Sequence, residues 1–383
     1  MVPFHYFWTR SSAAERCIHI ADVRGSNPLE STRSAYIMNV LFLCRYFYPH
    51  IGGVEKHVFE VSKRLVQKGY SVTVVTELHD TSLPIIQTYQ NIRIYRIPIQ
   101  NKETMKKFEI WKWMYKNKRL LLKADLIHCH DVFYWYLPFR FLFLNKPVFT
   151  TFHGYEKYPI SKRAIIIRKI SEKLSKGNIC IGKFIHKWYK THEDFISYGG
   201  VTDTNKHNGN YKKHSALFIG RLDSQTSIKT YINAIKYIKQ LMPDFMFEVI
   251  GEGILKRDIP KSTKVKKFQA QSISHISRYQ YAFVSRYLTM LEAMVSKRLV
   301  FAVYDNKIKE DYLLMSPFRN HVVIAKDARD LSKKVLYYLA NPYDEQKKVK
   351  RAYSWAKKQT WEHVVEIYLR LWKKSKQKDV ASI

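Results

Sequence analysis

Short apolar segments alternate with longer amphipathic ones from Met38 onward. The first segment, MNVLFLC, predicts a buried strand, and residues 53–68 then repeat apolar residues at helical spacing as far as Gly69. Further apolar, β-rich segments follow, each separated from the next by polar or helical sequence: SVTVVTE, IRIYRIPI, DLIHCH, KPVFTTFHG and NICIG. This alternation predicts a parallel sheet with crossover helices.

A second series of the same kind begins at Ala216, with the segments ALFIGRL, FMFEVIGEG, YAFVS, LVFAVYD and HVVIAK. We therefore expect an α/β protein with two doubly wound domains, residues 38–198 and 199–350, that meet at the glycine pair of SYGGV. The helical period near the carboxyl end predicts that residues 351–383 form a helix and a basic tail.

The first 37 residues differ in composition from the rest. They contain four arginines and no lysine, whereas the remainder contains 45 lysines and 17 arginines. The peptides SSAAE and GSNP can be encoded by D-arm and T-arm sequences of a transfer RNA gene. We therefore expect translation to begin at Met38 and residues 1–37 to lie outside the fold. A disordered or targeting extension is the alternative, although the apolar region of a signal peptide is missing.

The composition limits the class of protein. Lys and Arg number 66 against 32 Asp and Glu, a formal net charge of +34, which favours an anionic partner such as nucleic acid, acidic lipid or a phosphorylated substrate. The four cysteines form no CxxC pair, which argues against a disulfide scaffold or a structural zinc site and favours a cytoplasmic compartment. The longest apolar run, YWYLPFRFLFL, is too short and too interrupted to span a membrane.

The first predicted strand is followed by a loop that ends in Gly52 and Gly53. At the carboxyl end of a parallel strand, two glycines let the backbone approach a ligand, and the amino end of the next helix suits a phosphate. A tight turn explains a glycine pair about as well. The neighbouring motifs favour the ligand.

Six segments, in this order, resemble those of the family 4 retaining glycosyltransferases: MNVLFLCRYFYPHIGGVEKHV, DLIHCH, TTFHGYE, FIGRLD, VIGEG and LEAM. The resemblance covers nearly the whole chain from Met38. It implies the GT-B fold, in which two Rossmann-like domains face each other across a cleft and the carboxyl-terminal helix crosses back to the first domain. It also implies transfer of a sugar from a nucleotide-sugar donor, held by the second domain, to a lipid-linked or cell-surface glycan acceptor, held by the first. No metal or other cofactor is expected.

The resemblance also assigns roles to individual residues. His153 is similar to the histidine that approaches the donor sugar, and Arg221 to the arginine that neutralises the donor diphosphate, so both are expected catalytic residues. Breaking a sugar–diphosphate bond needs charge stabilisation on the leaving group more than it needs a strong base. Further donor contacts are expected from Gly52, Gly53, Gly251 and Glu292, the last at the ribose, and acceptor-side contacts from Glu55, His57 and His128.

Most of these residues also have a purely structural explanation. His153 could be a strand-end histidine with satisfied hydrogen bonds, and Arg221 a surface charge. Glu292 could be a helix-capping or ion-paired residue. For Glu55, in the first turn of a predicted helix, a favourable contact with the helix dipole is the better explanation.

Two departures from the family pattern affect the donor site. Thr226 and Ser227 stand where the family has a lysine and a glycine, and Lys229, one helical step on, is the expected substitute; Thr226 and Lys229 are therefore included among the donor-binding residues. The segment before Glu292 is shorter than in the family and lacks the first glutamate with its glycine loop, which leaves Arg286, Tyr287 and Thr289. These departures favour an alternative function, a non-catalytic nucleotide-sugar-binding subunit.

Residues 101–123 contain eight basic and two acidic residues, with Trp111, Trp113 and Tyr115 between them. Such a helix suits peripheral docking on an anionic membrane at its cytoplasmic face; a solvated helix with core aromatics is the alternative. Nucleic acid binding is not expected, because only the net charge favours it and no zinc-finger or RNA-recognition motif is present. The two histidines of HCH share one face of a strand but lack a third ligand, so no metal site is expected.

Overall fold

The computed structural model describes residues 37–99, 105–203, 210–269 and 272–381. From Met38 onward the chain forms one compact unit. The expectation for residues 1–37 lies outside the described residues, apart from Ile37 itself.

The first sheet contains eight strands in the order β3-β4-β2-β1-β5-β6-β7-β8. All neighbours pair in parallel except β3, which is antiparallel to β4. The central strand β1 pairs Val40 with Val72 on one side and with Leu126 on the other. The strands are β1 (Asn39–Cys44), β2 (Ser71–Glu77), β3 (Ile86–Tyr89), β4 (Ile92–Ile97), β5 (Leu126–His130), β6 (Val148–Phe152), β7 (Gly177–Ile181) and β8 (Phe195–Ser197).

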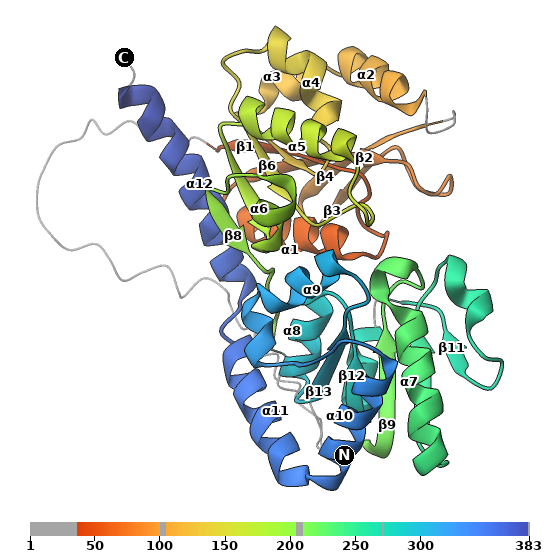
Figure 1. Cartoon of the computed structure of the whole chain (residues 1–383). Coiled ribbons are helices and arrows are strands. Elements are labelled where there is room, and N and C mark those ends of the chain that lie inside the picture. The colour runs from red at the N-terminus through yellow and green to blue at the C-terminus, as the bar shows by residue number, and fades with distance from the viewer. Residues whose placement is uncertain (1–36, 100–104, 204–209, 270–271, 382–383) are drawn as a thin grey trace, which may run out of the picture. The chain divides into compact units, whose positions relative to one another are not determined.

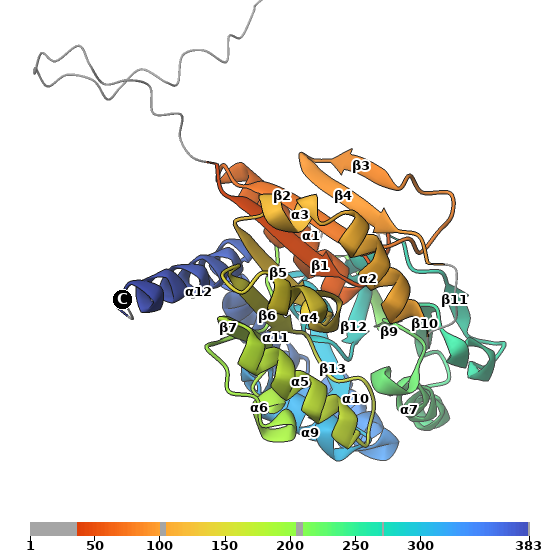
Figure 2. The same cartoon turned by 90° about the horizontal axis from the view of Figure 1, so that it is seen from above.

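Alternate residues of β1 face two helical layers. Leu41 and Leu43 pack in one core with α2, α3 and α4, whereas Phe42 packs in a second core with α1 and α12. Figures 1 and 2 show the helices on both faces of this sheet. Burial on both faces explains why its central strands are continuously apolar. The helices are α1 (Gly53–Gln67), α2 (Lys106–Lys116), α3 (Arg119–Lys123), α4 (Phe133–Leu142), α5 (Lys162–Leu174) and α6 (Phe184–Tyr189).

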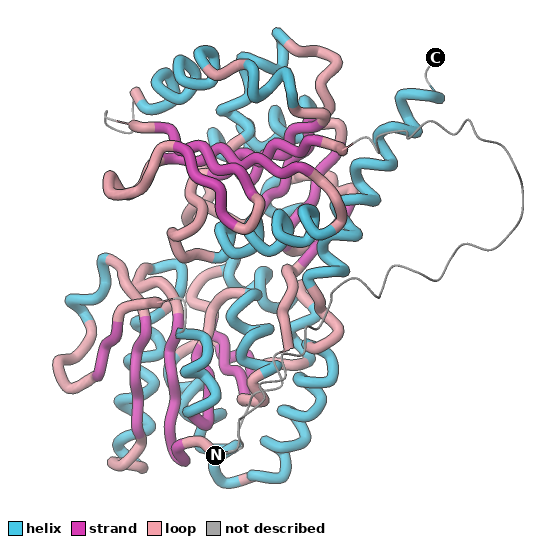
Figure 3. Tube along the Cα trace, turned by 180° about the vertical axis from the view of Figure 1, so that it is seen from behind, coloured by secondary structure: helices cyan, strands magenta, loops and turns pink. Residues whose placement is uncertain are grey.

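The second sheet contains six parallel strands in the order β11-β10-β9-β12-β13-β14. Figure 3 shows the two groups of strands as separate sheets. The strands are β9 (Lys212–Ile219), β10 (Met246–Ile250), β11 (Lys264–Lys266), β12 (Tyr279–Phe283), β13 (Leu299–Val303) and β14 (Val323–Ala325). The α-helices are α7 (Ile228–Leu241), α8 (Tyr287–Val295), α9 (Lys307–Leu314) and α10 (Ala328–Ala340), and the 3₁₀-helices are η1 (Ser224–Thr226), η2 (Ile254–Asp258), η3 (Ser272–Arg278) and η4 (Pro317–Asn320).

The carboxyl-terminal part forms two helices, α11 (Pro342–Ala356) and α12 (Trp361–Ala381), where the sequence predicted one helical stretch. The turn between them pairs with the segment that joins the two sheets, because the Val201 N–H donates to the Gln359 carbonyl at 2.8 Å. A Cβ atom added at Gly200 would lie only 2.8 Å from the Trp361 backbone, so this glycine permits the crossing. Helix α12 then contacts α1, β7 and β8 of the first domain, as expected.

The expected fold class is confirmed. Each sheet is the centre of a Rossmann-like domain, and the strands that the apolar pattern predicted are present in both. The three strands that the pattern did not predict, β3, β8 and β11, all lie at sheet edges.

Candidate functional site

The loop after β1 leaves open space beside Gly53. A Cβ atom added there would meet no atom within 4 Å, whereas one added at Gly52 would overlap only the Glu55 carboxylate. Glu55 lies in the first turn of α1, and its Oε1 is 3.0 Å from Nδ1 of His50. Glu55 thus lies at the amino end of α1, where a contact with the helix dipole is favourable, and Gly53 has room for a ligand.

His153 follows β6 and is fixed by two neighbours. Its backbone N–H donates to Oδ1 of Asp131 at 3.0 Å, and its Nε2 lies 2.9 Å from Nδ1 of His130. Burial raises the pKa of Asp131 to about 6, although Arg168 and the hydrogen bond from His153 oppose this shift. His57 packs edge-on against His153, with ring centroids 4.9 Å apart. The ring of His153 is thus held in one orientation at the carboxyl end of the first sheet.

His57 and His128 are only 1% and 0% exposed and belong to a buried hydrogen-bond network. The Tyr368 hydroxyl lies 2.9 Å from Nε2 of His57 and 3.0 Å from the Thr151 hydroxyl, which in turn lies 2.7 Å from Nε2 of His128. The Trp372 indole donates to Nδ1 of His128 at 3.1 Å, which places the His128 proton on Nε2. Both histidines therefore attach α12 to the first domain, and this buried position does not fit the acceptor contact expected of them.

Burial lowers the pKa of the four histidines in this region, that of His57 to about 3. These side chains are therefore neutral at pH 7 and can form hydrogen bonds without adding positive charge. Any cation that stabilises a departing anion must come from elsewhere. The four are His57, His128, His130 and His153.

Arg221 supplies a cation at the carboxyl end of β9. Its side chain is 64% exposed, and its Nε lies 3.3 Å from Oδ2 of Asp223. A terminal nitrogen of the same guanidinium donates to Oε1 of Gln225 at 2.9 Å. The Gln225 amide donates in turn to the carbonyl of Glu156, in the loop that follows His153. The two expected catalytic residues thus lie on loops that this hydrogen bond joins.

Thr226 and Lys229 are both expected donor contacts, with Lys229 as the second cation. In the structure each side chain has a partner within the protein. Thr226 is buried, and its hydroxyl lies 2.7 Å and 2.9 Å from the carbonyl oxygens of Arg221 and Asp223, so it stabilises the turn η1. The Lys229 ammonium is turned toward Asp258, 2.9 Å away in η2. The substitution of Lys229 for the missing lysine stays a prediction, and in this structure the charge of Lys229 is paired with Asp258.

Gly251 has a structural role. A Cβ atom added there would lie 2.0 Å from the carbonyl oxygen of Gly220. The Gly220 N–H donates to the Ile250 carbonyl at 3.1 Å, and the Gly251 N–H to the Lys266 carbonyl at 3.0 Å. The glycine thus lets the loops after β9 and β10 pack backbone to backbone, whether or not it also contacts a donor.

Glu292 in α8 is buried and forms an ion pair with Lys56 in α1. Burial raises the pKa of Glu292, while the charge of Lys56 acts in the opposite direction. The pair links the two domains. Glu292 is therefore ion-paired, which is one of its two structural explanations. A ribose bound here would have to share the Glu292 carboxylate with Lys56.

Two further cations lie near Arg221, and neither was expected from the sequence to bind the donor. Arg286 follows β12 and donates to Oε1 of Gln225 at 2.7 Å. Lys309, in the first turn of α9, is fully buried and donates to the Ser285 carbonyl. Because β9, β12 and β13 are neighbours in the sheet, the residues that follow them meet at one edge. In the sequence, a basic residue follows each of these three predicted strands, and this pattern could have identified Arg286 and Lys309 as candidates.

Within the described residues, no group of three or more His, Cys, Asp or Glu side chains is arranged to hold a metal ion. No helix in the same part of the chain is long and apolar enough to cross a membrane.

Comparison with known proteins finds a matching family model and several relatives. Residues 51–195 match the family model described as Glycosyltransferase Family 4. An uncharacterized glycosyltransferase of Methanocaldococcus jannaschii is 29% identical over 260 residues, which are 63% of this chain and 66% of that protein. The GPI3 subunit of phosphatidylinositol N-acetylglucosaminyltransferase of Saccharomyces cerevisiae is 32% identical over 60 residues, 16% of this chain and 13% of that protein. The chain thus covers less than two thirds of either relative.

Among solved structures, sucrose-phosphate synthase of Thermosynechococcus elongatus matches 88% of this chain and 98% of its own, with a TM-score of 0.71 and 13% sequence identity. At this identity the likeness shows the fold alone. That fold is the GT-B arrangement of two Rossmann-like domains.

Proposed function

We propose that this chain, a glycosyltransferase of the family 4 type with the GT-B fold, transfers a sugar from a nucleotide-sugar donor to a lipid-linked or cell-surface glycan. The position of Arg221 carries the proposal. This exposed cation lies at the carboxyl end of β9 and is joined through Gln225 to the loop that follows His153. Ligands of open α/β sheets bind at this end of the strands, and a guanidinium there suits a diphosphate.

In the proposed reaction, the bond between the anomeric carbon and the diphosphate oxygen breaks, and the diphosphate leaves with the electron pair. The acceptor oxygen bonds to the anomeric carbon and releases its proton to the departing diphosphate. Attack from the face that the diphosphate leaves would retain the configuration at that carbon. Arg221 stabilises the negative charge that grows on the leaving group, and His153 orients the sugar. The proposed mechanism uses no metal.

A thermal-shift panel of UDP-, GDP- and ADP-sugars tests donor binding, because a ligand that binds only the folded state raises its apparent stability. We expect one nucleotide series to raise the melting temperature of the wild type, and Arg221→Ala to reduce that shift. Arg319→Ala, which removes an exposed arginine in η4, is the matched control and should behave as wild type. If no series shifts the wild type, the proposal fails.

We further propose that the first domain docks on an anionic membrane, at the cytoplasmic face. Exposed apolar side chains on α2 and α3 support this: Phe108, Tyr115 and Leu122 are 49%, 59% and 51% exposed, on helices rich in lysine. The tryptophans fit the alternative of core aromatics better, since Trp111 donates to the Tyr134 carbonyl at 2.9 Å and both Trp111 and Trp113 pack against the core.

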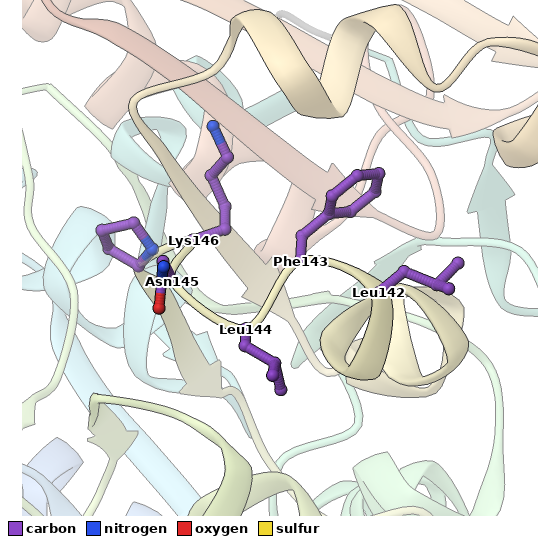
Figure 4. A pocket seen from close by; sticks show the side chains of 6 residues that line it. Leu142, Phe143, Leu144, Asn145 and Lys146 are labelled. Carbon is purple, nitrogen blue, oxygen red and sulfur yellow. The ribbon is translucent and has the colours of Figure 1, made fainter.

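An apolar tip at the carboxyl end of α4, formed by Phe141, Leu142 and Leu144, extends the proposed docking surface. Its three side chains are 63%, 64% and 66% exposed, and Figure 4 shows the side chains of residues 142–147, which line a pocket here. Arg140 donates to the Leu174 carbonyl and Lys146 to the Leu122 carbonyl, each at 3.0 Å, so the tip is anchored to α5 and α3. An anchored apolar tip between basic helices suits the boundary between lipid headgroups and acyl chains.

A membrane position agrees with the proposed lipid-linked acceptor. The yeast relative is named as part of a phosphatidylinositol N-acetylglucosaminyltransferase, and we propose an acceptor that is likewise presented at a lipid surface.

A further inference from the structure

We propose that Arg286 is the second cation of the donor diphosphate site and takes the place of the lysine that Thr226 replaces. This inference rests on the proposed function. It assigns a binding role to a residue for which the family resemblance offers no counterpart. The proposed ligand is the diphosphate group of a nucleotide-sugar, bound between Arg221 and Arg286.

The first observation is that Arg221 and Arg286 converge on one atom. Both guanidinium groups donate to Oε1 of Gln225, at 2.9 Å and 2.7 Å, so the two positive charges are close neighbours. Arg221 is paired with Asp223, whereas Arg286 forms no ion pair with any described residue. Two like charges held together by a neutral amide repel each other, and an anion bound between them would remove that repulsion.

The second observation is that the guanidinium of Arg286 is oriented by aromatic rings from both domains. Its central carbon lies 5.4 Å from the ring of Tyr155, which follows the His153 loop, and 5.8 Å from that of Tyr312 in α9. Tyr312 is itself stacked on Tyr287 at a centroid distance of 3.9 Å. Guanidinium–aromatic contacts of this kind fix the side chain without neutralising its charge. Arg286 is therefore a preorganised and still cationic group beside Arg221.

The third observation concerns Lys309, which lies behind Arg286. Its ammonium donates to the carbonyl of Ser285, the residue before Arg286, and lies 4.4 Å from the ring centroid of Tyr312. Burial lowers the pKa of Lys309, and so does the charge of Arg286.

Two carboxylates complete the surroundings of this lysine. The charges of Asp305 and Asp223 raise the pKa of Lys309, whereas those of Arg286 and Arg221 lower it. Because Lys309 is fully buried, it does not touch a ligand. It is a positioning residue that holds the Ser285–Arg286 turn.

Titration of the folded protein with UDP, GDP and ADP, and with the matching nucleosides, tests the role of Arg286. The wild type should bind one diphosphate more tightly than its nucleoside. Arg286→Gln should weaken diphosphate binding by about 10- to 100-fold, the usual effect of losing a charge-assisted hydrogen bond, and leave nucleoside affinity unchanged. Arg286→Lys should restore part of the loss, and Arg319→Gln should have no effect.

Lys309→Met tests the positioning role against Lys307→Met, which removes an exposed lysine two residues earlier in the same helix. We expect Lys309→Met to weaken diphosphate binding severalfold without changing nucleoside affinity, and Lys307→Met to bind as the wild type does. If the Lys309 variant does not fold, Arg286→Gln decides the proposal alone.

The outcomes separate this inference from the proposed function. A wild type that binds one diphosphate, together with an Arg286→Gln variant of equal affinity, overturns the role of Arg286 and leaves the proposed function standing. A wild type that binds none of the three diphosphates overturns both.

Discussion

The hydroxyl of Tyr368, in the last helix, lies 2.9 Å from Nε2 of His57, in the first. The same hydroxyl lies 3.0 Å from that of Thr151 in β6, and all three side chains are buried. The network therefore joins elements far apart in the sequence through polar atoms that water does not reach. Its loss leaves unpaired groups inside the protein.

Tyr368→Phe should lower the free energy of unfolding by about 1–3 kcal/mol, because it removes the buried hydroxyl that pairs with Nε2 of His57 and leaves Thr151 with His128 as its remaining side-chain partner. Urea unfolding followed by circular dichroism measures the change. Tyr343→Phe is the control, since this tyrosine is 75% exposed, and it should unfold as the wild type does. Equal midpoints for the two variants would show that the network does not stabilise the fold.

Stability should fall as the pH is lowered below about 6.5. Burial lowers the pKa of His57 to about 3 and depresses those of its three histidine neighbours, so the native state binds fewer protons than the unfolded chain. Each such histidine can remove up to about 1.4 kcal/mol per pH unit below that point. Asp131, whose pKa burial raises to about 6, offsets part of the loss.

Urea unfolding at several pH values between 5 and 8 measures this slope. His130→Phe removes one of the buried titrating groups and should flatten it, whereas His192→Gln, at an exposed position, should leave it unchanged. A wild type that is as stable at pH 5.5 as at pH 7.5 would rule out this account of the histidines.

Burial decides which strands could be predicted from the sequence. Buried central strands such as β1 and β13 are apolar on both faces, so a run of apolar residues identifies them. The edge strands β3, β8 and β11 are short and partly exposed, and they carry no such run.

The position of a candidate site residue was predictable where the residue lies just after its own strand, as His153 and Arg221 do. It was not predictable where the direction of a side chain decides its role, as for Lys229, which turns toward Asp258. A donor contact by Arg286 was not predictable either, because only the order of the strands in the sheet brings Arg286 beside Arg221.

Gly53 and Gly251 should respond differently to alanine. Gly251→Ala places a Cβ atom 2.0 Å from a backbone oxygen and should destabilise the protein, whereas Gly53→Ala meets no atom within 4 Å and should leave stability unchanged. If a ligand approaches the loop after β1, Gly53→Ala should nevertheless weaken donor or acceptor binding. Thermal melts with and without ligand measure both effects. A stable Gly53→Ala variant with unaltered binding would argue against a ligand at this loop.

The wild type should sediment with anionic vesicles and not with neutral ones, and the binding should weaken as salt rises, because each lysine near such a surface contributes about 1 kcal/mol that ions screen. Replacing both Phe141 and Leu144 by Asp should weaken binding by roughly tenfold or more, since two apolar side chains no longer enter the membrane. Leu241→Asp, at a 72% exposed position in the second domain, is the matched control. Equal binding to neutral vesicles would contradict the docking surface.

Release of nucleoside diphosphate from UDP-, GDP- and ADP-sugars tests most directly whether this chain transfers sugars from such donors. We expect the wild type to release diphosphate from one series, slowly with water and faster with an acceptor. Arg221→Ala should lower that rate by about 10²- to 10³-fold, the usual cost of losing one preorganised donor to a developing charge, and weaken donor affinity less. Arg319→Ala should keep the full rate. If the folded wild type binds a donor but releases no diphosphate under any of these conditions, the central claim is contradicted and the chain is better explained as a non-catalytic nucleotide-sugar-binding subunit.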